Sequence, residues 1–118
     1  MATPVVLKVS KKLHSQRPYL RIRVQDSDGV AFDFTGAVGV TFVMYTRSEE
    51  SEEKVNAPAI FVGDLSNGIL EYQWASADVD TIGEFFAEFD VDYGGGETMT
   101  LPGNGNILVT IFADVNGE

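Results

Sequence analysis

The stretch that most constrains the fold is NGILEYQWASADVDTIGEFFAEFDV, residues 67–91. In its first part Leu70, Tyr72 and Trp74 alternate with polar residues, and over residues 85–91 apolar side chains again occupy every second position. Alternation with a period of two is typical of strands that bury one face. We therefore expect two strands joined by a loop. Tyr72 and Trp74, the only tryptophan, should anchor the core because large aromatic side chains bury much area.

The same pattern recurs in short pieces along the rest of the chain. Alternating apolar segments are separated by turn-forming sequences such as DSDG, GGG and PGNGN. No segment has helical periodicity beyond a single turn, which fits residues 75–80. About seven to eight short strands with frequent turns predict an all-β fold, an immunoglobulin-like antiparallel β-sandwich. A β-barrel is the alternative.

The length of 118 residues predicts one domain. We divide the chain into a basic N-terminal arm or edge strand at residues 1–16 and the sandwich domain at residues 17–118. The sequence has no cysteine, which excludes disulfides and thiolate metal sites. It also has no apolar run typical of a signal peptide or a membrane span. We expect a protein that is made and used without secretion.

Charge is distributed very unevenly. Residues 1–25 hold six of the eight basic residues and no acid, whereas the rest of the chain carries two basic and eighteen acidic residues. Such asymmetry informs about partners rather than about fold. Two interpretations stay open: a basic edge folded onto its own acidic body, or an arm that docks on an acidic neighbour such as a second copy. The acidic body disfavours nucleic-acid binding because it would repel phosphate.

The residues that could act in catalysis or in metal or phosphate binding fit ordinary structural roles instead. His14 is the only histidine, and DSDG lacks the glutamate that a calcium loop needs at its twelfth position, where Ala37 stands. Asp78 and Asp80 fit a turn or cap, and GGG fits a hairpin rather than a phosphate-binding loop. We predict no catalytic, cofactor-binding or metal-binding residues.

An assembly interface is the remaining hypothesis. Phe86 is the strand aromatic whose parity points outward, so a second copy or a covering loop should pack on it. The N-terminal segment adds positive charge and a short apolar alternation that can join a sheet edge. The predicted interface residues are Val5, Leu7, Lys8, Val9, Lys11, Lys12, Arg17, Arg21, Arg23 and Phe86.

The order of short motifs resembles a family of small bacteriophage proteins related to the N-terminal immunoglobulin-like domain of the phage baseplate upper protein. The resemblance covers roughly residues 17–112, and most matched positions are core or turn residues. The matched positions are Asp26, Asp28 and Gly29; Asp33, Phe34, Thr35 and Gly36; Gly68, Tyr72 and Trp74; Asp78 and Gly83; Phe85, Ala87, Phe89 and Val91; and Thr100 and Pro102. The resemblance implies a virion structural protein of the tail or baseplate.

Together these observations predict a non-enzymatic phage structural protein that assembles through protein–protein contacts. Its expected partners are other virion proteins and copies of itself, with no nucleic acid, membrane, cofactor or small-molecule substrate. Its expected location is the virion, after synthesis in the host bacterial cytoplasm. A capsid decoration or head-fibre subunit is the alternative within this class. A carbohydrate- or cell-surface-binding module is the alternative from another class, and it would need an exposed aromatic platform.

Overall fold

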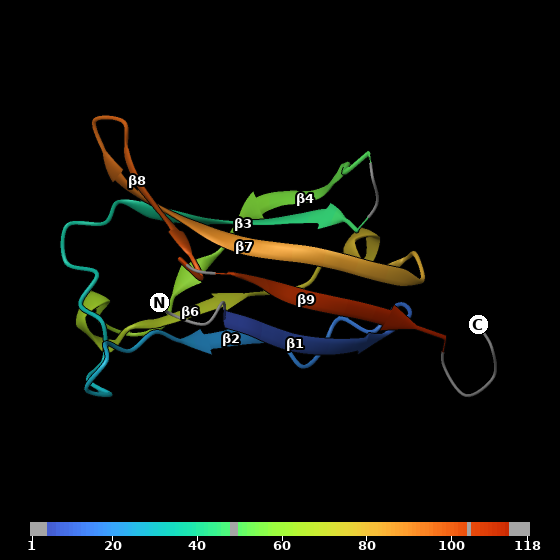
Figure 1. Cartoon of the computed structure of the whole chain (residues 1–118), viewed down its shortest axis with the longest axis horizontal. Helices are drawn as coiled ribbons and strands as arrows, with labels where there is room; N and C mark the ends of the chain where they lie inside the picture. The colour runs from blue at the N-terminus through green and yellow to red at the C-terminus, as the bar shows by residue number, and fades with distance from the viewer. Residues whose placement is uncertain (1–4, 48–49, 104, 114–118) are drawn as a thin grey trace.

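Two β-sheets packed face to face form the molecule in the computed structural model, which describes residues 5–47, 50–103 and 105–113 (Figure 1). The large sheet has the strand order β1 (Val5–Lys12), β9 (Gly105–Phe112), β7 (Gly83–Gly94), β3 (Gly39–Thr46), β4 (Glu53–Pro58), and β8 (Glu97–Leu101) also pairs with β7. The small sheet has the order β2 (Leu20–Arg23), β6 (Ile69–Tyr72), β5 (Ile60–Phe61). Two short 3-10 turns complete the described elements, η1 (Leu65–Asn67) and η2 (Ser76–Val79). The predicted all-β sandwich is confirmed.

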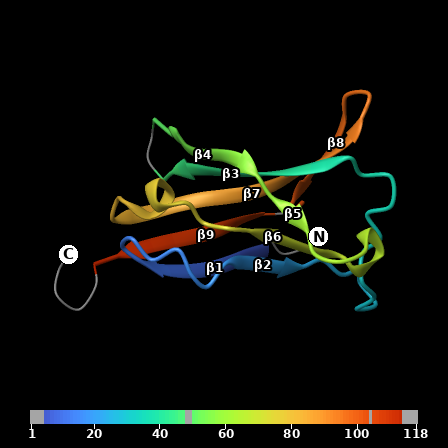
Figure 2. The ribbon, with the colours of Figure 1, turned by 180° about the vertical axis from the view of Figure 1, so that it is seen from behind.

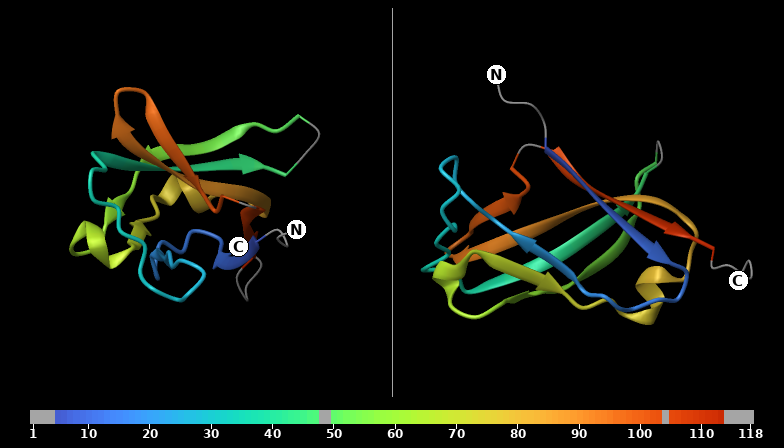
Figure 3. Two further views of the ribbon diagram at one scale, coloured as in Figure 1. Left: turned by 60° about the vertical axis from the view of Figure 1, so that its left-hand side comes forward. Right: turned by 90° about the horizontal axis from the view of Figure 1, so that it is seen from below.

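Two details differ from the prediction. Strand β1 runs parallel to β9, although the other pairings between strands are antiparallel in the described residues (Figure 3, right). The alternating pattern over residues 54–62 reads as one strand in the sequence, but the structure splits it in two, and the described residues contain nine strands rather than the expected seven to eight. Strand β4 ends at Pro58, which has no N–H to continue the ladder, and the chain then crosses to the small sheet as β5.

Strand β7 organises the large sheet. One of its edges pairs with β3 over residues 85–92, and the other edge pairs first with β9 and then with β8. Its inward residues are buried at every second position, as the alternation predicts. Strands β6 and β7, which are neighbours in the sequence, lie in opposite sheets.

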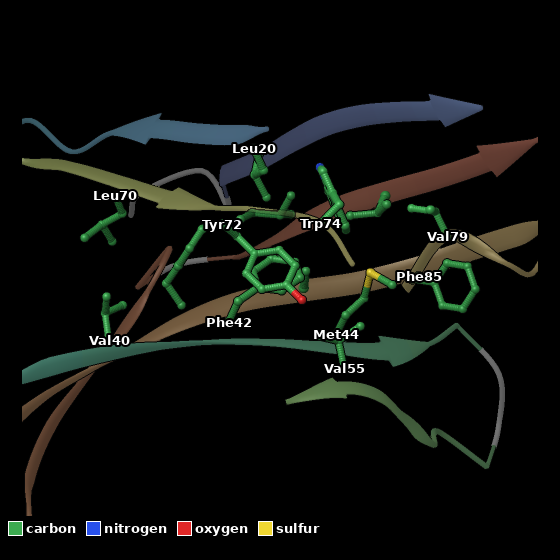
Figure 4. Packing of buried hydrophobic residues seen from close by; sticks show 14 of the residues in the cluster. Leu20, Val40, Phe42, Met44, Val55, Leu70, Tyr72, Trp74, Val79 and Phe85 are labelled. Carbon is green, nitrogen blue, oxygen red and sulfur yellow. The ribbon is translucent and has the colours of Figure 1, made fainter. Parts of the chain in front are cut away.

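The core lies between the sheets and is centred on Phe42 of β3 (Figure 4). Its ring stacks on Tyr72 with centroids 4.3 Å apart and meets the edges of Trp74 and Phe89 at 5.5 and 5.2 Å. Tyr72 and Trp74 are each 3% exposed, so their prediction as core residues is confirmed. The described residues include no helix long and apolar enough to cross a membrane.

The loop between β3 and β4 carries three glutamates, with Glu53 following as the first residue of β4, and we expect the loop to be dispensable for folding. Ser48 and Glu49 lie outside the described residues, and Glu50, Ser51 and Glu52 are exposed. Replacing residues 48–52 with a short Gly/Ser turn should leave the melting temperature nearly unchanged, because like charges repel and these exposed side chains bury little. Thermal unfolding followed by circular dichroism measures this. A large drop would show that the loop has packing contacts that stabilise the fold.

Candidate assembly surfaces

The edge strands β1 and β2 bring most of the basic residues to one side of the sandwich (Figures 1 and 2). Five of these residues are exposed, and we call them the basic edge: Lys8, Lys12, Arg17, Arg21 and Arg23. Lys8 and Lys12 pair in register with Leu108 and Phe112 of β9, whereas Arg21 and Arg23 belong to β2 of the other sheet. The basic edge therefore wraps around the side of the sandwich from one sheet to the other.

The aliphatic members of the predicted interface, Val5, Leu7 and Val9, lie in β1 with Lys8 and Lys12. Val9 is partly buried and packs against the core, so its side chain is committed to its own sandwich. The backbone of Val5 and Leu7 pairs in register with Gly105 and Ile107, and their side chains lie outside what the structure describes. Residues 5–12 thus occupy the position of an edge strand in their own chain, with the edge of β1 away from β9 unpaired among the described strands.

Lys11 does not belong to the exposed surface that we predicted. It is only 4% exposed, and its Nζ donates a hydrogen bond to the carbonyl oxygen of Pro18 at 2.9 Å. The ammonium also lies 5.7 Å from the ring centroid of Trp74. Burial lowers the pKa of Lys11, because a buried site disfavours the charged form. Alternation along β1 accounts for this position, since Lys11 pairs with Ile111, a core residue.

Few charges of the basic edge are neutralised within the chain. Arg21 forms an ion pair with Glu71 at 2.7 Å, and the other ion pairs of the described residues, Arg47–Glu84 and Lys54–Asp80, lie outside this edge. Lys8, Lys12, Arg17 and Arg23 form no ion pair with any acid that the structure describes. Four cations are thus available to a partner with acidic groups.

Glu71 is a buried acid on the central strand of the small sheet. Its side chain is 8% exposed and accepts hydrogen bonds from the Nε and Nη2 atoms of Arg21 and from Gln73. These bonds, Arg21 first, lower the pKa of Glu71. A lowered pKa means that this carboxylate stabilises the fold above the pKa of an unfolded glutamate, and that the contribution is lost as pH falls through the folded pKa.

Replacing Arg21 with methionine should raise the pKa of Glu71, because the strongest stabilisation of the carboxylate is removed. In this variant the ionised carboxylate of Glu71 should contribute less to the free energy of unfolding at pH values above the pKa of an unfolded glutamate. An NMR titration of the Glu71 carboxyl carbon measures the shift. Arg23→Met is the matched control, since Arg23 is exposed on the same strand and pairs with no described acid. Equal titration curves in both variants would contradict the assignment.

Phe86 lies on the outer face of the large sheet, as its parity predicts, but its own chain partly covers it. The Arg47 guanidinium lies 5.3 Å from the ring centroid and also contacts Glu84 at 3.0 Å. Phe86 is half-buried as a result. A second copy is therefore not needed to explain an aromatic residue at this position.

The outer face of the large sheet is acidic along β7. Glu84, Glu88, Asp90 and Asp92 alternate along the strand, and an open hollow beside them is lined by both aspartates, Thr41, Val43, Asn56, Thr98 and residues 94–96. Burial and the neighbouring Asp90 raise the pKa of Glu88. No aromatic side chain lines this hollow, so it does not offer the stacking platform that a sugar-binding module would use.

The remaining candidate acids have local structural roles. Asp26 Oδ1 accepts hydrogen bonds from the backbone N–H groups of Asp28 and Val30, which confirms the predicted turn. Asp78 is buried and accepts hydrogen bonds from the Tyr72 hydroxyl and the Ala75 N–H. Sequence reasoning missed the pairing with Tyr72, although Asp78 was singled out as a cap. Within the described part of the chain, no three His, Cys, Asp or Glu residues are grouped to hold a metal.

Comparisons with known proteins identify both a family and a fold. A family model described as the BppU N-terminal domain matches residues 15–102, more than half of the chain. Among solved structures, the N-terminal domain of phage TP901-1 ORF48 is similar with a TM-score of 0.50 and 18% sequence identity. That alignment covers 90% of this chain and 95% of the phage TP901-1 chain. At this identity the match shows a shared fold. No curated protein matches the chain.

Proposed function

Because the chain belongs to the family of the BppU N-terminal domain, the N-terminal domain of the phage baseplate upper protein, we propose that it is held in the virion by protein–protein contacts with other baseplate proteins and copies of itself. The observation that carries this proposal is the family match over residues 15–102. In this role the protein is a non-enzymatic structural component, made in the host cytoplasm before assembly. Nucleic acid, membrane lipid and small molecules have no part in its function.

The surface supports contacts with a protein partner. The basic edge presents four cations without a described acid beside them, and β1 leaves one row of backbone groups unpaired among the described strands. Charges of this kind steer association and fix orientation, while an open strand edge supplies backbone hydrogen bonds. We therefore assign the intermolecular contact to Lys8, Lys12, Arg17 and Arg23. Phe86 remains a secondary candidate because Arg47 covers part of its ring.

Cryo-electron microscopy of intact particles tests the location. A tagged copy of the chain should be found at the tail baseplate. Density on the head instead would favour the alternative of a capsid decoration or head-fibre subunit. Absence from purified particles would overturn the proposed role.

Charge variants test the contact itself. Changing Lys8 and Arg23 to glutamine should reduce incorporation into particles, because both cations lie on the basic edge. Lys54→Gln is the control, since Lys54 is a cation outside the basic edge that pairs with Asp80 of its own chain. Quantitative immunoblotting of purified particles measures incorporation, with circular dichroism to confirm folding. Equal incorporation of both variants would exclude the basic edge as the contact.

A further inference from the structure

Strand β1 is attached to the sandwich in an unusual way. It pairs only with β9 among the described strands, and this pairing is parallel, between the two extremes of the chain (Figure 3, right). The matched family region begins at residue 15, after β1 has ended. The match ends at residue 102, before β9 begins, so both strands of the parallel pair lie outside the matched region, and β1 is joined to that region through residues 13–19.

The inward face of β1 contains a charge where an apolar side chain would pack better. Lys11 is buried with one hydrogen-bond acceptor, the Pro18 carbonyl, and no described acid pairs with it. The neighbouring Trp74 Nε1 is buried without a described hydrogen-bond partner. Buried cations and donors without partners weaken packing. The site that holds β1 therefore binds its strand less tightly than a fully apolar site would.

The segment that follows β1 contains a strained residue. His14 has a φ of +67°, and no other non-glycine residue of the described chain has a positive φ. The His14 N–H donates a hydrogen bond to the Val79 carbonyl at 2.8 Å, which holds the turn in this conformation. Side chains with a β-carbon are disfavoured in the left-handed region. A short, strained connection favours domain swapping, in which the segment before the connection packs on a second copy of the chain.

We propose that β1 is exchanged between copies of this chain, so that β1 of one molecule lies beside β9 of the next. This inference rests on the proposed function, because it names the contact that joins neighbouring copies. The strand makes the same contacts with β9 and the core in the closed and the exchanged form. Only the connection at residues 13–19 differs, and it relaxes when the strand extends to a neighbour. The strain at His14 therefore sets the equilibrium, while Lys11 and Trp74 set how readily the strand detaches.

Cysteine cross-linking of full-length chains tests the exchange directly, since the natural sequence has no cysteine. Ser10 of β1 and Thr110 of β9 are register partners. When Ser10→Cys chains are mixed with Thr110→Cys chains, a short bis-maleimide should join the two kinds of chain. Each single variant alone provides the background. Asp92→Cys mixed with Thr98→Cys is the matched control, because these register partners belong to the hairpin of β7 and β8, which is not exchanged.

Two further variants separate equilibrium from rate. His14→Gly should lower the cross-linked fraction at equilibrium by at least about fivefold, because glycine removes the strain that favours the exchanged form. Lys11→Met should slow the appearance of the cross-link after mixing several-fold, because an apolar side chain holds the strand more tightly. It also removes the hydrogen bond to Pro18 in the connection, so the equilibrium fraction is judged on His14→Gly. Cross-linking no greater than in the control pair would overturn the proposal, as would an unchanged fraction in His14→Gly. Either result leaves the location of the protein in the particle, and thus the proposed function, unaffected.

Discussion

Truncating Trp74 to alanine should lower the free energy of unfolding by about 3–5 kcal/mol. The side chain is 3% exposed and meets the stacked rings of Phe42 and Tyr72 edge-on, with ring centroids 5.5 and 5.4 Å away. Its removal leaves a large cavity between two sheets that are each held in place by their own backbone ladders, so the cavity cannot close easily. Equilibrium unfolding in urea measures the loss.

Trp74→Phe separates the contribution of the ring from that of the indole N–H. Because Nε1 finds no described hydrogen-bond partner, phenylalanine loses volume without losing a hydrogen bond. It should therefore destabilise the fold much less than alanine. A loss below about 1 kcal/mol for Trp74→Ala would contradict the position of this residue at the centre of the core.

The local pattern of the sequence predicted the strands well because a period of two reports which face is buried. Leu70, Tyr72 and Trp74 are all buried, and β7 keeps its alternation over its whole length. The same pattern carries no information about which strands pair. Strands β6 and β7 are neighbours in the sequence but belong to opposite sheets, and β1 reaches β9 at the other end of the chain.

Burial of charged residues was the part that the sequence could not predict. Glu71 has the parity of an exposed residue, yet it is buried because Arg21, from a strand fifty positions earlier, covers it with two hydrogen bonds. Lys11 stands among exposed basic residues in the sequence, yet its ammonium contacts the Trp74 ring and the Pro18 carbonyl. For Glu71 a contact between distant segments decides the environment, and no local signal encodes it. For Lys11 the alternation along β1 gives the inward position, but the contact of its ammonium with Trp74 depends on a distant segment.

Gly68 belongs to the same motif as Tyr72 and Trp74, and the structure explains why glycine is needed at this position. Gly68 has a φ of +70°, and a β-carbon at this position would lie 2.7 Å from the Val24 carbonyl oxygen and 2.9 Å from the Phe32 N and O atoms. These are backbone atoms held by hydrogen bonds from Val24 N–H to Gly68 O and from Phe32 N–H to Val24 O. They cannot move aside as the end of a flexible side chain could.

Gly68→Ala should therefore destabilise the fold by at least about 3 kcal/mol, from the left-handed backbone and from the overlap together. Gly29→Ala is the matched control, because Gly29 has a similar φ of +81° and its β-carbon would meet no described atom within 4 Å. The control should lose only the backbone contribution, about 1–2 kcal/mol. Urea unfolding of both variants measures the difference between them. Equal losses would show that the backbone around Gly68 yields to a methyl group, and that its conformation alone accounts for the glycine.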